Sequence, residues 1–143
     1  MNINYKGTKV NYIIEGSGEI NIVYLHGWGG SVSSFLPLAK HMSFATNILI
    51  DFPPFGESDE PSVPFELNDY VNIVNVILEQ QNVKKFSIVS HSFGTRVAVM
   101  MCCKNINVDK LVITSGAGIK PKNKLKKFFR KIRYKVIKFF TTT

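Results

Sequence analysis

The sequence predicts an α/β fold in which helices cover both faces of a mainly parallel sheet, forming a three-layer sandwich. Continuous apolar runs such as 20–27 and 86–90 suit buried strands, and stretches with helical periodicity separate them. Buried strands separated by helices are typical of parallel sheets. A chain of 143 residues is long enough for one domain with a substantial core.

The expected elements alternate along the chain. Residues 2–16 contain alternating or apolar runs around Gly7, which predict an opening hairpin. The elements expected after it are a strand over 20–27, a short helix over 35–42, a strand over 47–53, a helix over 69–81, a strand over 86–90, a helix over 93–104 and a strand over 109–116.

The composition is that of a globular protein, with 45% hydrophobic and 12% aromatic residues. The two cysteines, Cys102 and Cys103, are neighbours on an expected helix, so they cannot provide a disulfide framework. The N-terminus lacks the apolar core of a signal peptide, and no apolar stretch reaches the roughly 18 residues of a spanning helix. We therefore expect a cytoplasmic protein.

Three motifs fall at the carboxyl ends of expected strands, where parallel sheets bind ligands. They are LHGWGGS at 25–31, DFPPFGESDEP at 51–61 and VSHSFGT at 89–95. Their order and spacing resemble the α/β-hydrolase superfamily, in its esterase, epoxide-hydrolase and C–C-hydrolase-like branch. The resemblance covers about residues 5–118.

The third motif resembles a nucleophile elbow, with Ser92 as the nucleophile. Such a serine lies on a tight strand-to-helix turn, so the residues two before and two after must be small. Ser90 and Gly94 meet this requirement, although the family more often has glycine in place of Ser90. The alternative is an ordinary serine-rich turn.

The first motif resembles an oxyanion loop. The resemblance implies that the backbone amides of Trp28 and Phe93 stabilise the negative charge of an acyl-transfer transition state, while the Trp28 indole lines the pocket. The alternative is a glycine-rich turn that only connects strand to helix. In the second motif, Asp51 is expected to bind loop amides, and Pro54 stands where a glycine is common. No cofactor and no metal are expected.

A complete catalytic triad cannot be assembled from this sequence. The family places an acid and then a histidine after the serine, but only one acid, Asp109, and no histidine follow Ser92. We expect His26 to order the oxyanion loop, His91 to pack at the elbow, and His41 to be a surface or packing residue.

The family's sheet continues with a cap and two further strands that carry the acid and the base. We therefore expect a truncated α/β-hydrolase fold that lacks the last strands, produced by truncation, a frameshift or a split gene. Residues 1–119 would be the N-terminal part of the core, and 120–143 the start of a cap. The strand over 109–116 would then be an exposed edge through which the chain self-associates.

The charge is unevenly distributed. Residues 1–109 contain 7 of the 18 basic side chains and all 10 acidic ones, a net charge of −3, whereas 110–143 have a net charge of +11. Residues 123–140 have the pattern of a basic amphipathic helix. We favour a cap helix that covers the substrate pocket; the alternative is binding to an anionic membrane surface or acidic partner. No specific nucleic-acid binding is expected, because no recognition fold accompanies the charge.

Two functional hypotheses follow. In the first, the protein is a serine hydrolase acting on small-molecule esters or related carbonyl compounds through Ser92, catalytically incomplete as given. In the second, it is a non-catalytic membrane-surface or interaction protein that works through 123–140.

Overall fold

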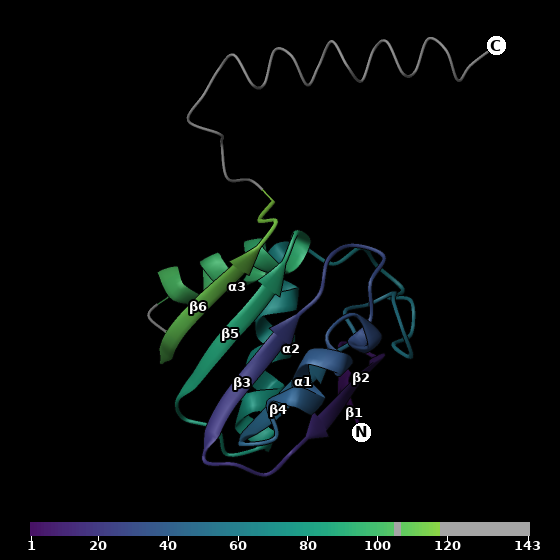
Figure 1. Cartoon of the computed structure of the whole chain (residues 1–143). Helices are drawn as coiled ribbons and strands as arrows, with labels where there is room; N and C mark the ends of the chain where they lie inside the picture. The colour runs from purple at the N-terminus through teal and green to yellow at the C-terminus, as the bar shows by residue number, and fades with distance from the viewer. Residues whose placement is uncertain (105–106, 118–143) are drawn as a thin grey trace, which may run out of the picture.

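The computed structural model describes residues 1–104 and 107–117, which form a single sheet with helices on both sides (Figure 1). The strands are β1 (Asn2–Tyr5), β2 (Thr8–Glu15), β3 (Ile20–Leu25), β4 (Ala45–Ile50), β5 (Phe86–His91) and β6 (Val108–Thr114). The helices are the short 3-10 helix η1 (Val32–Ser34), α1 (Leu36–His41), α2 (Leu67–Gln80) and α3 (Phe93–Cys103).

The strand order in the sheet is β1-β2-β4-β3-β5-β6. β1 and β2 form the predicted antiparallel hairpin, and β2 also pairs antiparallel with β4. The other neighbours are parallel, with Ile22 of β3 opposite Asn47 of β4 and Ser87 of β5. The mainly parallel sheet predicted from the sequence is therefore confirmed.

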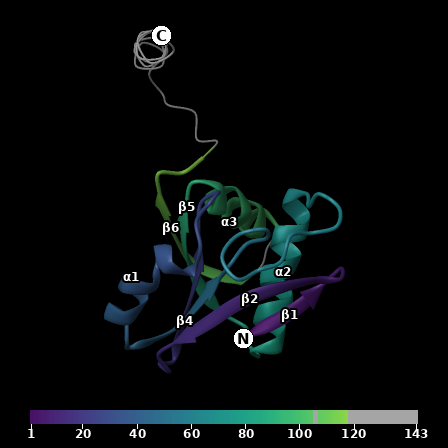
Figure 2. The ribbon, with the colours of Figure 1, turned by 90° about the vertical axis from the view of Figure 1, so that its right-hand side faces the viewer.

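Helices cover both faces of the sheet, as Figure 2 shows edge-on. The face toward α2 and α3 holds the larger apolar core, which includes Ile73, Ile77 and Val97. The face toward α1 holds a smaller cluster that includes Tyr24 and Ala39. The predicted three-layer α/β sandwich is confirmed.

Helix α2 begins two residues before the predicted start, because its first turn is closed by a capping box. The Glu66 side chain accepts from the backbone of Asp69, and the Asp69 carboxylate accepts the Glu66 N–H at 2.9 Å. The Asp69 carboxylate also binds the hairpin, through the Tyr5 hydroxyl at 3.0 Å and the Lys6 ammonium at 2.7 Å.

Among the residues that the structure describes, strand β6 lies at the edge of the sheet and pairs with β5 on one side. Two of its apolar side chains are open to solvent, with Val112 51% and Ile113 38% exposed. No helix in the described part of the chain has the length and apolarity to cross a membrane. The amphipathic helix predicted over 123–140 and the cap segment 120–143 lie outside the described residues.

Candidate active site

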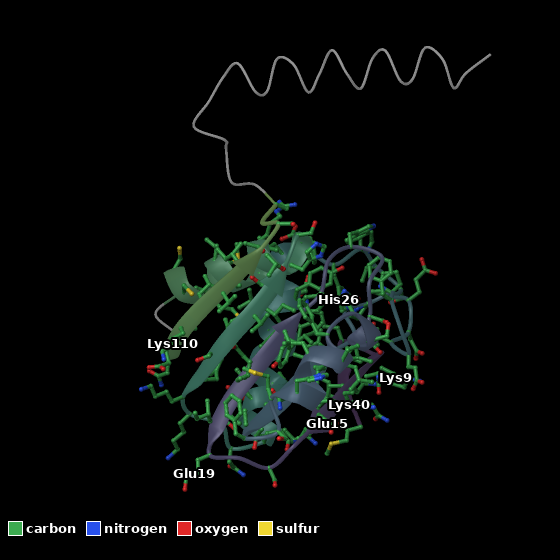
Figure 3. The ribbon with its side chains drawn as sticks, in the orientation of Figure 1. Lys9, Glu15, Glu19, His26, Lys40 and Lys110 are labelled. Atoms are coloured by element: carbon green, nitrogen blue, oxygen red, sulfur yellow. The ribbon has the colours of Figure 1, made fainter. Side chains whose placement is uncertain are left out.

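The three sequence motifs meet at one edge of the sheet. β3, β4 and β5 run parallel and end at Leu25, Ile50 and His91, so their following loops emerge together. Figure 3 labels His26 at this edge and Glu19 at the opposite end of β3. The site is therefore where parallel sheets place their chemistry.

Ser92 occupies the turn between β5 and α3 in a conformation that non-glycine residues rarely adopt, with φ 47° and ψ −110°. Its N–H donates to the Thr114 carbonyl at 3.3 Å. Its own carbonyl accepts from the N–H groups of Thr95 and Ala117, both at 3.2 Å. The end of β6 and the first turn of α3 thus hold the backbone of Ser92 on both sides.

The two small residues that flank the turn are required for different reasons. A Cβ at Gly94 would overlap the carbonyl group of Leu25, and the Gly94 N–H donates to the His26 carbonyl at 3.1 Å. Ser90 is fully buried, and its hydroxyl donates to the Val112 carbonyl at 3.2 Å. Gly94 allows α3 to approach β3, whereas Ser90 links β5 to β6.

The loop after β3 packs directly against this turn. A Cβ added at Gly27 would lie 3.1 Å from the Ser92 Cβ and 2.7 Å from His91 Nδ1. His91 is exposed to solvent, with its ring beside Gly27. The predicted position of His91, packed at the elbow, agrees with this geometry.

Trp28 and Phe93 lie side by side next to Ser92. Their ring centroids are 5.4 Å apart, and the Trp28 side chain is 65% exposed. Within residues 1–104 and 107–117, the N–H groups of Trp28 and Phe93 have no hydrogen-bond acceptor. Two unpaired amides therefore come from the two segments that flank Ser92.

His26 connects the first loop to the second. It is 1% exposed, its Nδ1 lies 2.7 Å from the Gly27 carbonyl, and its Nε2 accepts the Phe52 N–H at 2.9 Å. These partners require the neutral tautomer with the proton on Nδ1. Burial lowers the pKa of His26, partly opposed by the Gly27 hydrogen bond and the nearby Asp51 carboxylate. His26 thus orders the loop, as predicted.

Asp51 is fully buried and organises the second loop. Its carboxylate accepts from the Val32 N–H at 2.6 Å, the Glu57 N–H at 3.0 Å and the Asn11 side-chain amide at 2.9 Å. A Cβ at Gly56, where φ is +62°, would overlap this carboxylate. The contacts agree with the predicted architectural role.

The other titratable candidates lie away from Ser92. Asp109, the one acid after Ser92 in the sequence, forms an exposed 2.8 Å ion pair with Lys85 at the amino end of the sheet. His41 is exposed on α1, with Nδ1 2.7 Å from the Pro37 carbonyl. In the part of the chain that the structure describes, no three potential ligands are grouped to hold a metal.

A hollow of about 400 Å³ lies at the amino ends of β3 and β5, lined by Ile20, Lys85 and Asp109 among others. This is the opposite edge of the sheet from Ser92. Parallel sheets bind ligands at the carboxyl ends of their strands, so we do not place the site in this hollow.

Comparison with known proteins identifies the family. The family model described as "alpha/beta hydrolase fold" matches residues 20–143. The chain belongs to the α/β-hydrolase family. The resemblance inferred from the motifs is confirmed.

Two solved hydrolase structures share the fold. An epoxide hydrolase from Bacillus megaterium aligns with a TM-score of 0.74 at 21% identity, covering 81% of this chain and 42% of that one. An α/β-hydrolase-fold protein from Burkholderia ambifaria aligns with a TM-score of 0.76 at 18% identity, covering 86% and 46%.

A curated relative also matches this chain over less than half of the relative's own length. The 2-succinyl-6-hydroxy-2,4-cyclohexadiene-1-carboxylate synthase of Salmonella typhimurium is 30% identical over 101 residues, which are 69% of this hydrolase-family chain. The chain spans 39% of the length of that relative.

Sequence reasoning missed the groups that hold the site from outside the motifs. Thr114 and Ala117 bind the Ser92 backbone, and Ser31 caps η1 through an exchange of hydrogen bonds with Ser34. The usual capping-box signature has glutamate or glutamine at the third position after the cap, and Ser34 stands there instead, so the pattern did not reveal this cap. The contacts of Thr114 and Ala117 depend on the pairing of β5 with β6, which the sequence does not specify.

Proposed function

We propose that Ser92 is the nucleophile of a hydrolase that acts on esters or related carbonyl compounds. The observation that carries this proposal is the conformation of Ser92, with φ 47° at a strand-to-helix turn held from both sides. A strained serine at this position of a parallel sheet is typical of a nucleophile elbow.

The amides of Trp28 and Phe93 are the proposed oxyanion hole. Both N–H groups lack an acceptor within the described residues, and both come from segments in contact with Ser92. Preorganised donors at the developing oxyanion are usually the largest electrostatic contribution to acyl transfer. The donors are backbone groups, so side-chain variants of Trp28 keep them.

The proposed reaction is acyl transfer through Ser92. The Ser92 oxygen bonds to the carbonyl carbon, the carbonyl π electrons move to the oxygen, and the hydroxyl proton passes to water. The oxyanion electron pair then re-forms the carbonyl as the C–O bond to the leaving alcohol breaks, and the alkoxide takes a proton from water. Water releases the acyl group by the same route.

Turnover by this chain is expected to be slow. In the described residues, no side chain hydrogen-bonds the Ser92 hydroxyl, and the sequence has no histidine after it. Oxyanion stabilisation and binding alone give about 10³–10⁴-fold acceleration over water in serine hydrolases that have lost triad members.

The test is covalent labelling of the purified chain with a fluorophosphonate, located by mass spectrometry, together with hydrolysis of an activated aryl ester. We expect labelling at Ser92 and weak turnover, both lost in Ser92→Ala and both kept in Ser62→Ala, which removes another serine hydroxyl. Ester turnover that survives Ser92→Ala would refute the assignment. Turnover at the rate of an ordinary esterase would reveal a base, with His91 the first side chain to test.

A second proposed property is self-association through β6. Val112 and Ile113 are exposed on the last strand of the sheet that the described residues form, and unpaired apolar edges template association. The membrane-binding alternative and the cap assignment for 120–143 remain predictions from the sequence, because those residues lie outside the described ones.

A further inference from the structure

Three aromatic rings from the segments around the Ser92 turn pack together. The Trp28 indole lies 4.9 Å from the Phe55 ring and 5.4 Å from the Phe93 ring, with interplanar angles of 79° to both. The three residues come from the loop after β3, the loop after β4 and the start of α3. We call Trp28, Phe55 and Phe93 the aromatic wall.

The wall is supported from behind. Phe93 contacts Tyr70 at 5.0 Å and Phe52 at 6.1 Å, each nearly edge to face. Phe55 lies 6.2 Å from the buried His26 ring. The two inner rings therefore pack against the core, and the Trp28 ring packs on both of them.

Trp28 is the outer ring and is open to solvent. Its side chain is 65% exposed, although it contacts two other rings, and Gly27 before it packs against Ser92. Apolar surface on an exposed indole contributes favourable free energy when a ligand covers it. Its edge-to-face neighbours make the exposed surface suited to another aromatic ring.

We infer that, if Ser92 is the nucleophile proposed above, the substrate carries an aromatic ring next to the reacting carbonyl, and this ring packs on Trp28. Replacing this aromatic ring with a saturated ring of equal size would weaken binding. Aromatic pairs gain stability beyond the area they bury because the ring faces and edges carry opposite partial charges. A saturated ring is at least as apolar but has no such charge distribution.

The test measures binding without catalysis, in the 143-residue Ser92→Ala chain. Trp28 is the only tryptophan, so intrinsic fluorescence reports directly on the wall. The probes are ethyl phenylacetate and ethyl cyclohexylacetate, which have the same carbon skeleton. We expect the phenyl ester to bind about two- to tenfold more tightly than the cyclohexyl ester.

A matched pair of variants locates the preference. Phe55→Leu removes one ring of the wall and should reduce the preference for the phenyl ester by about twofold or more. Phe44→Leu makes the same change at a phenylalanine that is 60% exposed before β4, at the amino edge of the sheet, and should leave the preference intact.

The outcomes separate this inference from the function on which it rests. Equal binding of the two esters, tighter binding of the cyclohexyl ester, or an equal effect of Phe44→Leu would overturn the aromatic preference while labelling of Ser92 still stood. A phenyl preference that depends on Phe55 supports the wall. If the phenyl preference is observed but Ser92 is not labelled, the proposal that Ser92 is the nucleophile fails, and the aromatic wall is a binding site for aromatic rings.

Discussion

Gly94 lies directly against the backbone of Leu25, so that a Cβ at Gly94 would overlap the Leu25 carbonyl group. The contact joins the first turn of α3 to the last residue of β3. It also brings the Gly94 N–H within 3.1 Å of the His26 carbonyl. The approach of these two backbones places the Ser92 turn beside the loop that contains Gly27 and Trp28.

Replacing Gly94 by alanine should therefore destabilise the protein by about 3 kcal/mol, because a rigid backbone group must move to admit the methyl group. Helix propensity alone predicts the opposite sign, since alanine is about 1 kcal/mol better than glycine inside a helix. Urea unfolding followed by circular dichroism measures the difference.

The control for this variant is Gly7→Ala. Gly7 has φ +80° and open space around its Cα, so alanine there should cost about 1 kcal/mol through backbone strain alone. An equal loss of unfolding free energy in the two variants would show that the contact between Gly94 and Leu25 does not add to the destabilisation.

Strain at Ser92 predicts an unusual order of stability among its variants. Ser92→Gly should be about 1 kcal/mol more stable than Ser92→Ala, because glycine accepts φ 47° without a Cβ penalty. At Ser87, a β5 residue with ordinary negative φ, the order should reverse, with glycine about 0.5–1 kcal/mol below alanine. Chemical denaturation of the four variants tests both orders.

The fold could be predicted from the sequence because each strand and helix has its own apolar pattern. The start of α2 shifted because Glu66 caps the helix, and glutamate is not among the usual N-cap residues. Strand boundaries shifted as well: β4 covers Ala45–Ile50 instead of 47–53, and β3 ends at Leu25 instead of residue 27. Helix η1 was not predicted, since three residues are too few for a periodic signal.

The site could be predicted only in part. The motifs identified the turn at Ser92 and the small residues around it, because the requirement for small side chains is local. The contacts of Thr114 with Ser92 and of Trp28 with Phe55 join segments more than 20 residues apart. Such contacts depend on strand register and loop packing, which no short pattern encodes.

Burial of His26 predicts that stability depends on pH. Its pKa is lowered in the folded protein, so between that value and about 6.5 the unfolded chain binds more protons. The contribution of His26 is therefore fully present above about pH 6.5 and is lost as the pH falls toward the lowered folded pKa. Urea unfolding at a series of pH values should show this decline.

Two variants assign the decline to His26. His26→Asn should lower stability at neutral pH and flatten the decline, and His41→Gln, which removes an exposed imidazole, is the control for the loss of a histidine. If His26→Asn does not fold, NMR titration of the native imidazoles gives the same information. A His26 ring that protonates at or above about pH 6.5 would contradict the prediction.

The last prediction concerns self-association through the exposed edge strand β6. In the described part of the chain, β6 pairs with β5 on one side only, and Val112 is 51% exposed. The free edge of β6 in one copy can therefore pair with the β6 edge of another copy. A lysine at an edge strand opposes such pairing through charge repulsion and the cost of burying an ammonium group. Sedimentation velocity should show concentration-dependent association of the unmodified chain and less of it in Val112→Lys.

Val63→Lys places the same charge on an exposed loop valine and should associate like the unmodified chain. A compact monomer at every concentration, or equal effects of the two lysines, would rule out β6 as the associating edge.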